Sequence, residues 1–71
     1  MEDTPIKIVV NGRTRDIAPG TTVSKLLQAL SVPATRVAVE HNNEIIRRPA
    51  FETVELAAGD RLEIVTLVGG G

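Results

Sequence analysis

The chain has 71 residues, a formal net charge of −1 and no cysteine, so we expect one small domain without a disulfide or a thiolate metal site. Its acidic and basic residues are interspersed and Phe51 is its single aromatic residue, which disfavours nucleic-acid binding through a basic stripe or stacked bases. No apolar run approaches the roughly 20 residues that span a bilayer, and the acidic start has no apolar signal-peptide core, so a cytoplasmic protein is expected.

The chain opens with the pattern of a β-hairpin. Apolar residues alternate over residues 6–10, which is typical of a strand. Asn11 and Gly12 follow, and this dipeptide favours a two-residue turn because both residues tolerate positive φ. Residues 13–17 then form a polar returning strand.

A short amphipathic helix is predicted next. Pro19 and Gly20 break the strand, and Thr21 or Thr22 can cap a helix by accepting a hydrogen bond from a free N–H of its first turn. The apolar residues of the helix recur at i, i+3, i+4 and i+7, and they are Val23, Leu26, Leu27 and Leu30. Pro33 ends any continuation, which gives a helix of about eight to ten residues.

The middle of the chain reads as a strand, a turn and a short apolar segment. Residues 37–40 form a third strand with Val37 and Val39 on one face. Residues 41–44 form a turn, and the apolar pair at 45–46 follows it.

The last predicted strand spans residues 61–67. The irregular segment before it, which we expect to cover an edge of the core, contains Phe51, Val54 and Leu56. Leu62 and Ile64 alternate with charged residues, so this pair should face the core. Val65 and Leu67 then point outward, which makes them our candidates for partner binding.

This order of elements predicts an α+β fold. A single amphipathic helix can bury its apolar stripe only against one face of a sheet. We therefore expect a roll in which the first hairpin and the final strand form a mixed sheet, with the one main helix packed across it.

Catalysis inside the fold is not expected. His41 is the single histidine, and a polar turn residue is favoured over a catalytic or ligand role. One histidine with scattered carboxylates has no metal-ligand spacing, so no metal is expected. Arg47 and Arg48 could bind an anion, but a solvated turn or a partner contact is favoured.

The C-terminal residues Gly69, Gly70 and Gly71 are the most informative part of the sequence. Glycine lets the backbone pass through narrow spaces, and five extended residues from Leu67 reach roughly 17 Å. Such a tail could bring a terminal carboxylate into the active site of another protein. A frayed terminus would have the same sequence. We divide the chain into a domain at residues 1–68 and a flexible glycine tail at 69–71.

These segments together resemble the thiamine-biosynthesis sulfur carrier family, whose members have a ubiquitin-like β-grasp fold. The segments that carry the resemblance are Asn11-Gly12, Pro19-Gly20-Thr21-Thr22-Val23 with Leu26-Leu27, Val37-Ala38-Val39-Glu40, Asn42-Asn43-Glu44-Ile45-Ile46, and Gly59-Asp60-Arg61-Leu62-Glu63-Ile64-Val65 before the glycines. The sequence departs from the family where Asn43 replaces a frequent Gly and where Gly69 precedes the usual Gly-Gly end. Asn tolerates positive φ, so the turn at Asn43 is still feasible.

The resemblance implies a protein carrier rather than an enzyme. An ATP-dependent, E1-like adenylating enzyme would activate the carboxylate of Gly71. Sulfur from a persulfide, originating with a cysteine desulfurase, would displace AMP and leave a thiocarboxylate, and thiazole synthase would accept that sulfur. Gly69 and Gly70 would allow the tail to enter the active sites of these enzymes. The resemblance implies no bound cofactor, because ATP is used by the partner.

Other functions remain open at this point. The related small subunit of molybdopterin synthase uses the same terminal chemistry for another cofactor. A ubiquitin-like modifier would instead be joined to target lysines through Gly71. A β-grasp interaction module with an inert tail is the remaining alternative.

Overall fold

The computed structural model describes residues 4–67. Their elements follow in the order β1 (Ile6–Val10), β2 (Arg13–Ile17), α1 (Val23–Ala29), the 3₁₀ helix η1 (Ala34–Arg36), β3 (Val37–His41), β4 (Glu44–Ile46), the 3₁₀ helix η2 (Arg48–Glu52) and β5 (Arg61–Thr66). Each strand that the sequence predicts is present.

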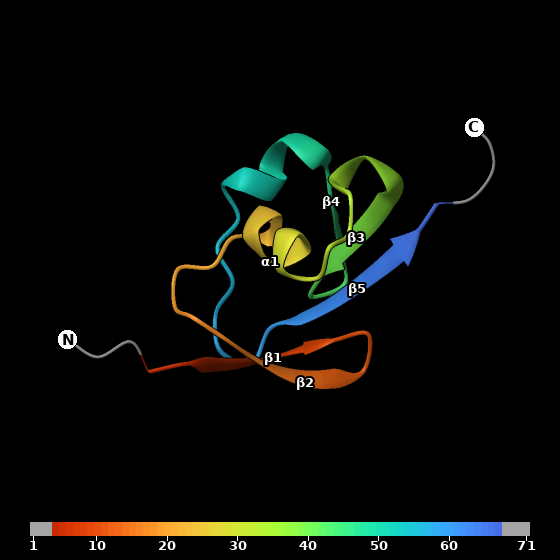
Figure 1. Ribbon diagram of the computed structural model, residues 1–71. Helices are drawn as coiled ribbons and strands as arrows, with labels where there is room; N and C mark the ends of the chain where they lie inside the picture. The colour runs from red at the N-terminus through yellow and green to blue at the C-terminus, as the bar shows by residue number, and fades with distance from the viewer. Residues whose placement is uncertain (1–3, 68–71) are drawn as a thin grey trace.

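The strands form one mixed sheet with α1 across one face, as Figure 1 shows. The strand order is β2-β1-β5-β3-β4, so the last strand lies at the centre of the sheet. β1 and β5 are parallel, whereas the β1–β2, β3–β5 and β3–β4 pairs are antiparallel. The predicted α+β roll is confirmed, and β3 and β4 extend the sheet beyond the three strands that the sequence assigned to it.

The turn between β1 and β2 has the predicted form. Asn11 and Gly12 have φ values of 50° and 81°, so both central residues are left-handed. This is the geometry of a type I′ turn, whose twist matches that of the flanking strands. The turn fixes the register in which Val10 lies opposite Arg13.

Helix α1 begins where the sequence places it but ends earlier. The Thr22 side chain accepts a hydrogen bond from the backbone N–H of Lys25 at 3.2 Å, so Thr22 is the N-cap. The helix ends at Ala29 and has seven residues, whereas the position of Pro33 predicts about eight to ten. The cause is local: Ser31 has a φ of 59°, and the backbone N–H groups of Ser31 and Val32 bond to carbonyls of the last helical turn. These bonds form a Schellman motif, which stops the helix without proline.

The core lies between α1 and the helix-facing side of the sheet. Its buried apolar residues are Ile8, Val23, Leu26, Leu27, Val37, Val39, Phe51, Leu56 and Leu62. Leu30, Val54 and Ile64 are half-buried and pack against this cluster. The predicted helix stripe and the predicted inward faces of β3 and β5 are confirmed.

The predicted turn at residues 41–44 is wrong in its extent. His41 and Glu44 pair as strand residues, so only Asn42 and Asn43 form the turn. Their φ values of 51° and 73° make a second type I′ turn, which asparagine enters more readily than most residues. The expectation that Asn43 tolerates positive φ is confirmed.

Candidate functional site

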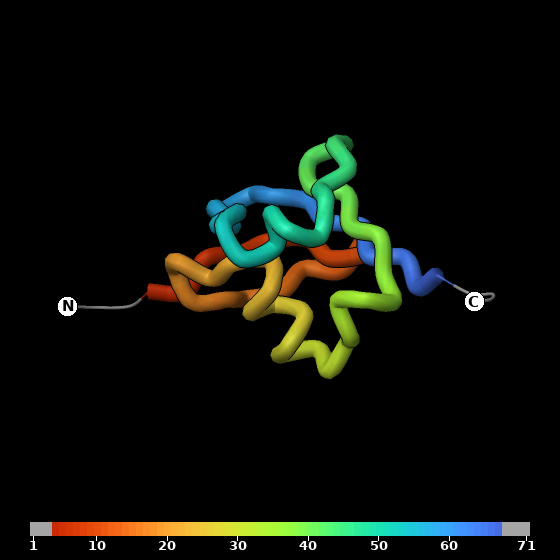
Figure 2. The backbone as a smooth tube through the Cα atoms, turned by 90° about the horizontal axis from the view of Figure 1, so that it is seen from above, coloured from red at the N-terminus to blue at the C-terminus, as the bar shows by residue number. Residues whose placement is uncertain are grey.

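The strand that leads to the glycine residues is held between two neighbours. β5 pairs with β1 on one side and with β3 on the other. It ends at Thr66, one residue before the predicted limit, yet Leu67 is still tied to the domain because its backbone N–H donates to the carbonyl of Arg36 at 2.7 Å. Figure 2 shows the described chain beginning and ending at opposite ends of the molecule. The domain therefore holds the chain in place up to Leu67.

The first hairpin turn also holds β5. The side-chain Oδ1 of Asn11 accepts a hydrogen bond from the backbone N–H of Ile64 at 2.7 Å, and its Nδ2 donates to the carbonyl of the same residue at 3.1 Å. The side-chain amide of Asn11 thus makes the two hydrogen bonds that the backbone of a neighbouring strand would make, just beyond the end of β1. This contact continues the short parallel pairing of β1 with β5.

The second hairpin turn holds the beginning of β5 in a related way. The Oδ1 of Asn42 accepts a hydrogen bond from the backbone N–H of Arg61 at 2.9 Å, and its backbone N–H donates to the carbonyl of Arg61. Its Nδ2 donates to Oδ1 of Asp60 at 3.2 Å. Asn11 and Asn42 are the first central residues of the two turns, and their side chains hydrogen-bond to the backbone of β5 at Ile64 and at Arg61.

His41 also helps to hold the start of β5 in place and is not a freely solvated turn residue. It is the last residue of β3, and its Nε2 lies 2.7 Å from Oδ2 of Asp60. The backbone N–H of Ala57 donates to the same oxygen at 2.9 Å. Partial burial alone would raise the pKa of Asp60, but the hydrogen bonds from His41, Ala57 and Asn42 outweigh it and lower the pKa below its ordinary value. This cluster fixes the loop before β5.

The outer face of the sheet, away from α1, carries an exposed apolar patch. Ile45, Val65 and Leu67 are 74%, 56% and 55% exposed. Ala38 lies opposite Val65 across the β3–β5 pair. Two shallow depressions of about 310 and 460 Å³ both include Ala38 and Ile45, one with Leu67 and the other with Val65. We call these residues, Ala38, Ile45, Val65 and Leu67, the outer apolar patch.

Two acidic residues border the patch. Glu40 lies directly opposite Glu63 in the β3–β5 pair, and both side chains are exposed. Like charges at directly opposite positions destabilise a sheet. The pair is therefore a feature that folding alone does not favour.

Val65 and Leu67 are the part of this surface that the sequence predicts. The outward direction of Val65 and Leu67 agrees with their exposure. Ile45 was not singled out, although consecutive strand residues face opposite sides and Ile46 is the one that packs on the core. The glycines Gly69, Gly70 and Gly71 lie outside the described residues, as does the proposed boundary after residue 68.

Of the other sequence candidates, Arg48 lines the same depression as Leu67 and so lies beside this surface. Arg47 and Arg48 are exposed at the start of η2. Within residues 4–67, no group of three or more His, Cys, Asp or Glu side chains is arranged to hold a metal ion. Over the same residues, no helix is long and apolar enough to cross a membrane.

Comparison with known proteins identifies relatives across nearly all of the chain. Residues 8–71 match the model of the ThiS family. The chain is 42% identical to the sulfur carrier protein ThiS of Bacillus subtilis over 50 residues, which are 70% of this chain and 76% of that protein. It is also 42% identical to a thiazole synthase of Paramagnetospirillum magneticum over 66 residues, but these cover 93% of this chain and only 20% of that enzyme.

A solved structure supports the same assignment. The crystal structure of the thiamine biosynthesis protein ThiS from Geobacter metallireducens superimposes with a TM-score of 0.81 at 36% identity, covering 93% of this chain and all of that one. The fold, including the central last strand, is thus that of the ThiS proteins. The resemblance seen in the sequence is confirmed, and the chain belongs to the ThiS family.

Proposed function

We propose that this chain carries sulfur for thiamine biosynthesis on the C-terminal carboxylate of Gly71. The observation that carries the proposal is that the ThiS family match extends through Gly71, so the glycines belong to the matched region. The similarity to the B. subtilis relative, a sulfur carrier protein, supports the same function. The chain supplies a reactive end, and its partner enzymes supply the catalysis.

The proposed chemistry begins with activation of a poor electrophile. A carboxylate is negatively charged and lacks a good leaving group, so an adenylating enzyme converts Gly71 into an acyl adenylate at the expense of ATP. A persulfide sulfur attacks the carbonyl carbon and AMP leaves. A second thiol then attacks the S–S bond and releases the thiocarboxylate. Thiazole synthase takes the sulfur from that group.

The domain contributes positioning to this sequence of steps. Because Leu67 is bonded to Arg36, the tail starts from a fixed point beside the outer apolar patch. A partner that docks on the patch therefore receives the tail at a defined place, which lowers the entropic cost of bringing Gly71 to the reacting atoms. We propose the outer apolar patch as that docking surface, with Val65 and Leu67 at its tail end.

Thiazole synthase is the proposed acceptor. The two curated relatives named thiazole synthase, at 42% and 36% identity, each match this chain over only 20% of their length. In those proteins a ThiS-like segment is therefore part of the same polypeptide as the remaining sequence. This arrangement supports a working contact between the two kinds of domain.

Intact-mass analysis tests the proposal directly. The chain is incubated with its genome's adenylating enzyme, ATP and a persulfide donor, and we expect one terminal oxygen to be replaced by sulfur. A chain that lacks Gly70 and Gly71 serves as the control and should remain unloaded. Isopeptide conjugates to lysines without any thiocarboxylate would contradict the carrier function and favour a protein modifier.

A further inference from the structure

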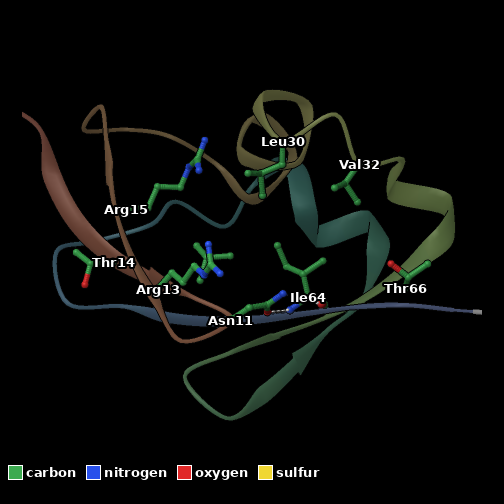
Figure 3. Close-up of a pocket in the computed structure, with 9 residues that line it drawn as sticks. Asn11, Arg13, Thr14, Arg15, Leu30, Val32, Ile64 and Thr66 are labelled. Carbon is green, nitrogen blue, oxygen red and sulfur yellow. Dashed lines mark hydrogen bonds between the residues drawn. The ribbon is translucent and has the colours of Figure 1, made fainter.

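A second surface lies on the opposite face of β5. An open groove of about 600 Å³ runs between β2 and the segment that follows α1, as Figure 3 shows. Its apolar lining comes from Val10, Leu30, Val32 and Ile64. Arg13 and Arg15 line it from β2, and Thr66 lies at its far end. The groove thus extends to the last residue of the strand that leads to the tail.

The register of the hairpin explains why two arginines face this groove. Arg15 lies opposite Ile8, a buried core residue, and Arg13 lies opposite Val10, which packs against the core. Both arginines therefore stand on the face of the sheet that α1 covers elsewhere. Both remain exposed, and the groove separates them from Leu30 and Val32, which follow α1.

The charge of the groove is not balanced within the described chain. No acidic residue lines it. Over residues 4–67, neither the Arg13 nor the Arg15 side chain has a carboxylate within salt-bridge distance. On the other face of the same hairpin, Lys7 and Asp16 do pair, at 2.8 Å. The hairpin is thus neutralised on one face and basic on the other, where the surface beside it is apolar.

We propose that this groove is a second docking surface, which binds an acidic segment of thiazole synthase that also carries an apolar side chain. Charge complementarity identifies the occupant, since guanidinium groups bind carboxylates through paired hydrogen bonds while the apolar lining buries an aliphatic group. Ile64 and Thr66 face this groove, whereas Val65 and Leu67 belong to the outer apolar patch. A partner that contacts both surfaces holds the end of β5 from its two faces.

This inference rests on the proposed function, because thiazole synthase is the partner. The test is a calorimetric titration of the chain into that enzyme from the same genome, at low and at moderate salt. We expect Arg13→Glu and Arg15→Glu each to raise Kd about tenfold, with a smaller salt dependence than wild type. Arg15→Lys keeps the positive charge but loses the planar guanidinium group, so its loss of affinity should lie between those of wild type and Arg15→Glu.

Lys25→Glu is the matched control. Lys25 is exposed on α1 and does not line the groove, so the same charge change there should alter Kd less than about twofold. If wild type binds and the arginine variants bind equally well, the groove proposal is wrong while the proposed function stands. If wild type does not bind thiazole synthase at all, the groove proposal and the proposed acceptor are both wrong, whereas sulfur loading of Gly71 is decided separately by the intact-mass experiment. Self-association of wild type that the arginine variants lose would instead identify a second copy of this chain as the occupant, and overturn the proposal.

Discussion

Asp60 shows how a single side chain supports the strand that carries the tail. Its carboxylate accepts hydrogen bonds from His41, from Asn42 and from the backbone of Ala57, and its side chain is only 14% exposed. Hydrogen bonds to charged groups contribute about 1.5–3 kcal/mol when they are well formed. The cluster therefore joins the end of β3 to the loop before β5 more firmly than a surface ion pair would.

This cluster predicts a defined loss of stability in acid. The pKa of Asp60 is lowered in the folded state, so its contribution is complete above the unfolded-state value of 3.8 and is lost as pH falls through the lower folded-state value. We expect Asp60→Asn to reduce the free energy of unfolding by about 1–3 kcal/mol at neutral pH and to remove this part of the acid dependence. Denaturant unfolding at a series of pH values measures both effects.

Asp16→Asn provides the control for that prediction. Asp16 pairs with Lys7, but the two side chains are 58% and 72% exposed. Surface pairs of this kind contribute about 0–1 kcal/mol, so the control should change stability little. An equal loss in the two variants would contradict the special role of Asp60.

At the scale of elements, the two hairpin turns act on β5 through their asparagine side chains. Asn11→Gly keeps a residue that enters positive φ but deletes both side-chain bonds to Ile64. We expect it to lower the free energy of unfolding by about 1–2 kcal/mol and the melting temperature by about 4–8 °C per kcal/mol. Calorimetry measures this change.

Asn43→Gly is the matched substitution in the other turn. Asn43 has a φ of 73°, and the hydrogen bonds of the described residues include none from its side chain. Glycine relieves the left-handed conformation at little cost, so this variant should be as stable as wild type or more stable. A loss equal to that of Asn11→Gly would show that the turn conformation, rather than the amide bonds to β5, sets the stability.

The same elements show what a single sequence can predict. The first hairpin, the helix stripe and the inward face of β5 follow from local periodicity and turn residues, and all were predicted. The end of α1 was missed because the left-handed conformation of Ser31 has no strong sequence signal. The bonds from Asn11 to Ile64 join residues 53 positions apart, and local patterns do not report such contacts. The exposure of Ile45 could have been predicted from the sequence, since alternation along β4 places only one of the two neighbouring isoleucines on the core.

At the scale of the whole molecule, the buried core and the outer apolar patch lie on opposite faces of the sheet. The helix-facing side holds the buried core, and the outer side exposes the apolar patch beside the opposed Glu40 and Glu63. Contiguous exposed apolar side chains often mark interaction sites, and the opposed like charges do not stabilise the sheet, so both features agree with the proposed docking surface. The patch includes Leu67, the last described residue, so under the proposed function docking on the patch would also position the tail.

This division predicts that binding and folding can be separated at Val65. Because Val65 is 56% exposed, Val65→Asp should cost only about 1 kcal/mol of stability, mostly through lower strand propensity, and the domain should remain folded. A carboxylate in the centre of an apolar contact should weaken binding to thiazole synthase about tenfold or more. Ala58→Asp adds the same charge at an exposed turn residue outside the patch and should bind as wild type does. Titration calorimetry paired with thermal melts separates the outcomes: unfolding of Val65→Asp would mean that the residue supports the core, and unchanged affinity would place the docking surface elsewhere.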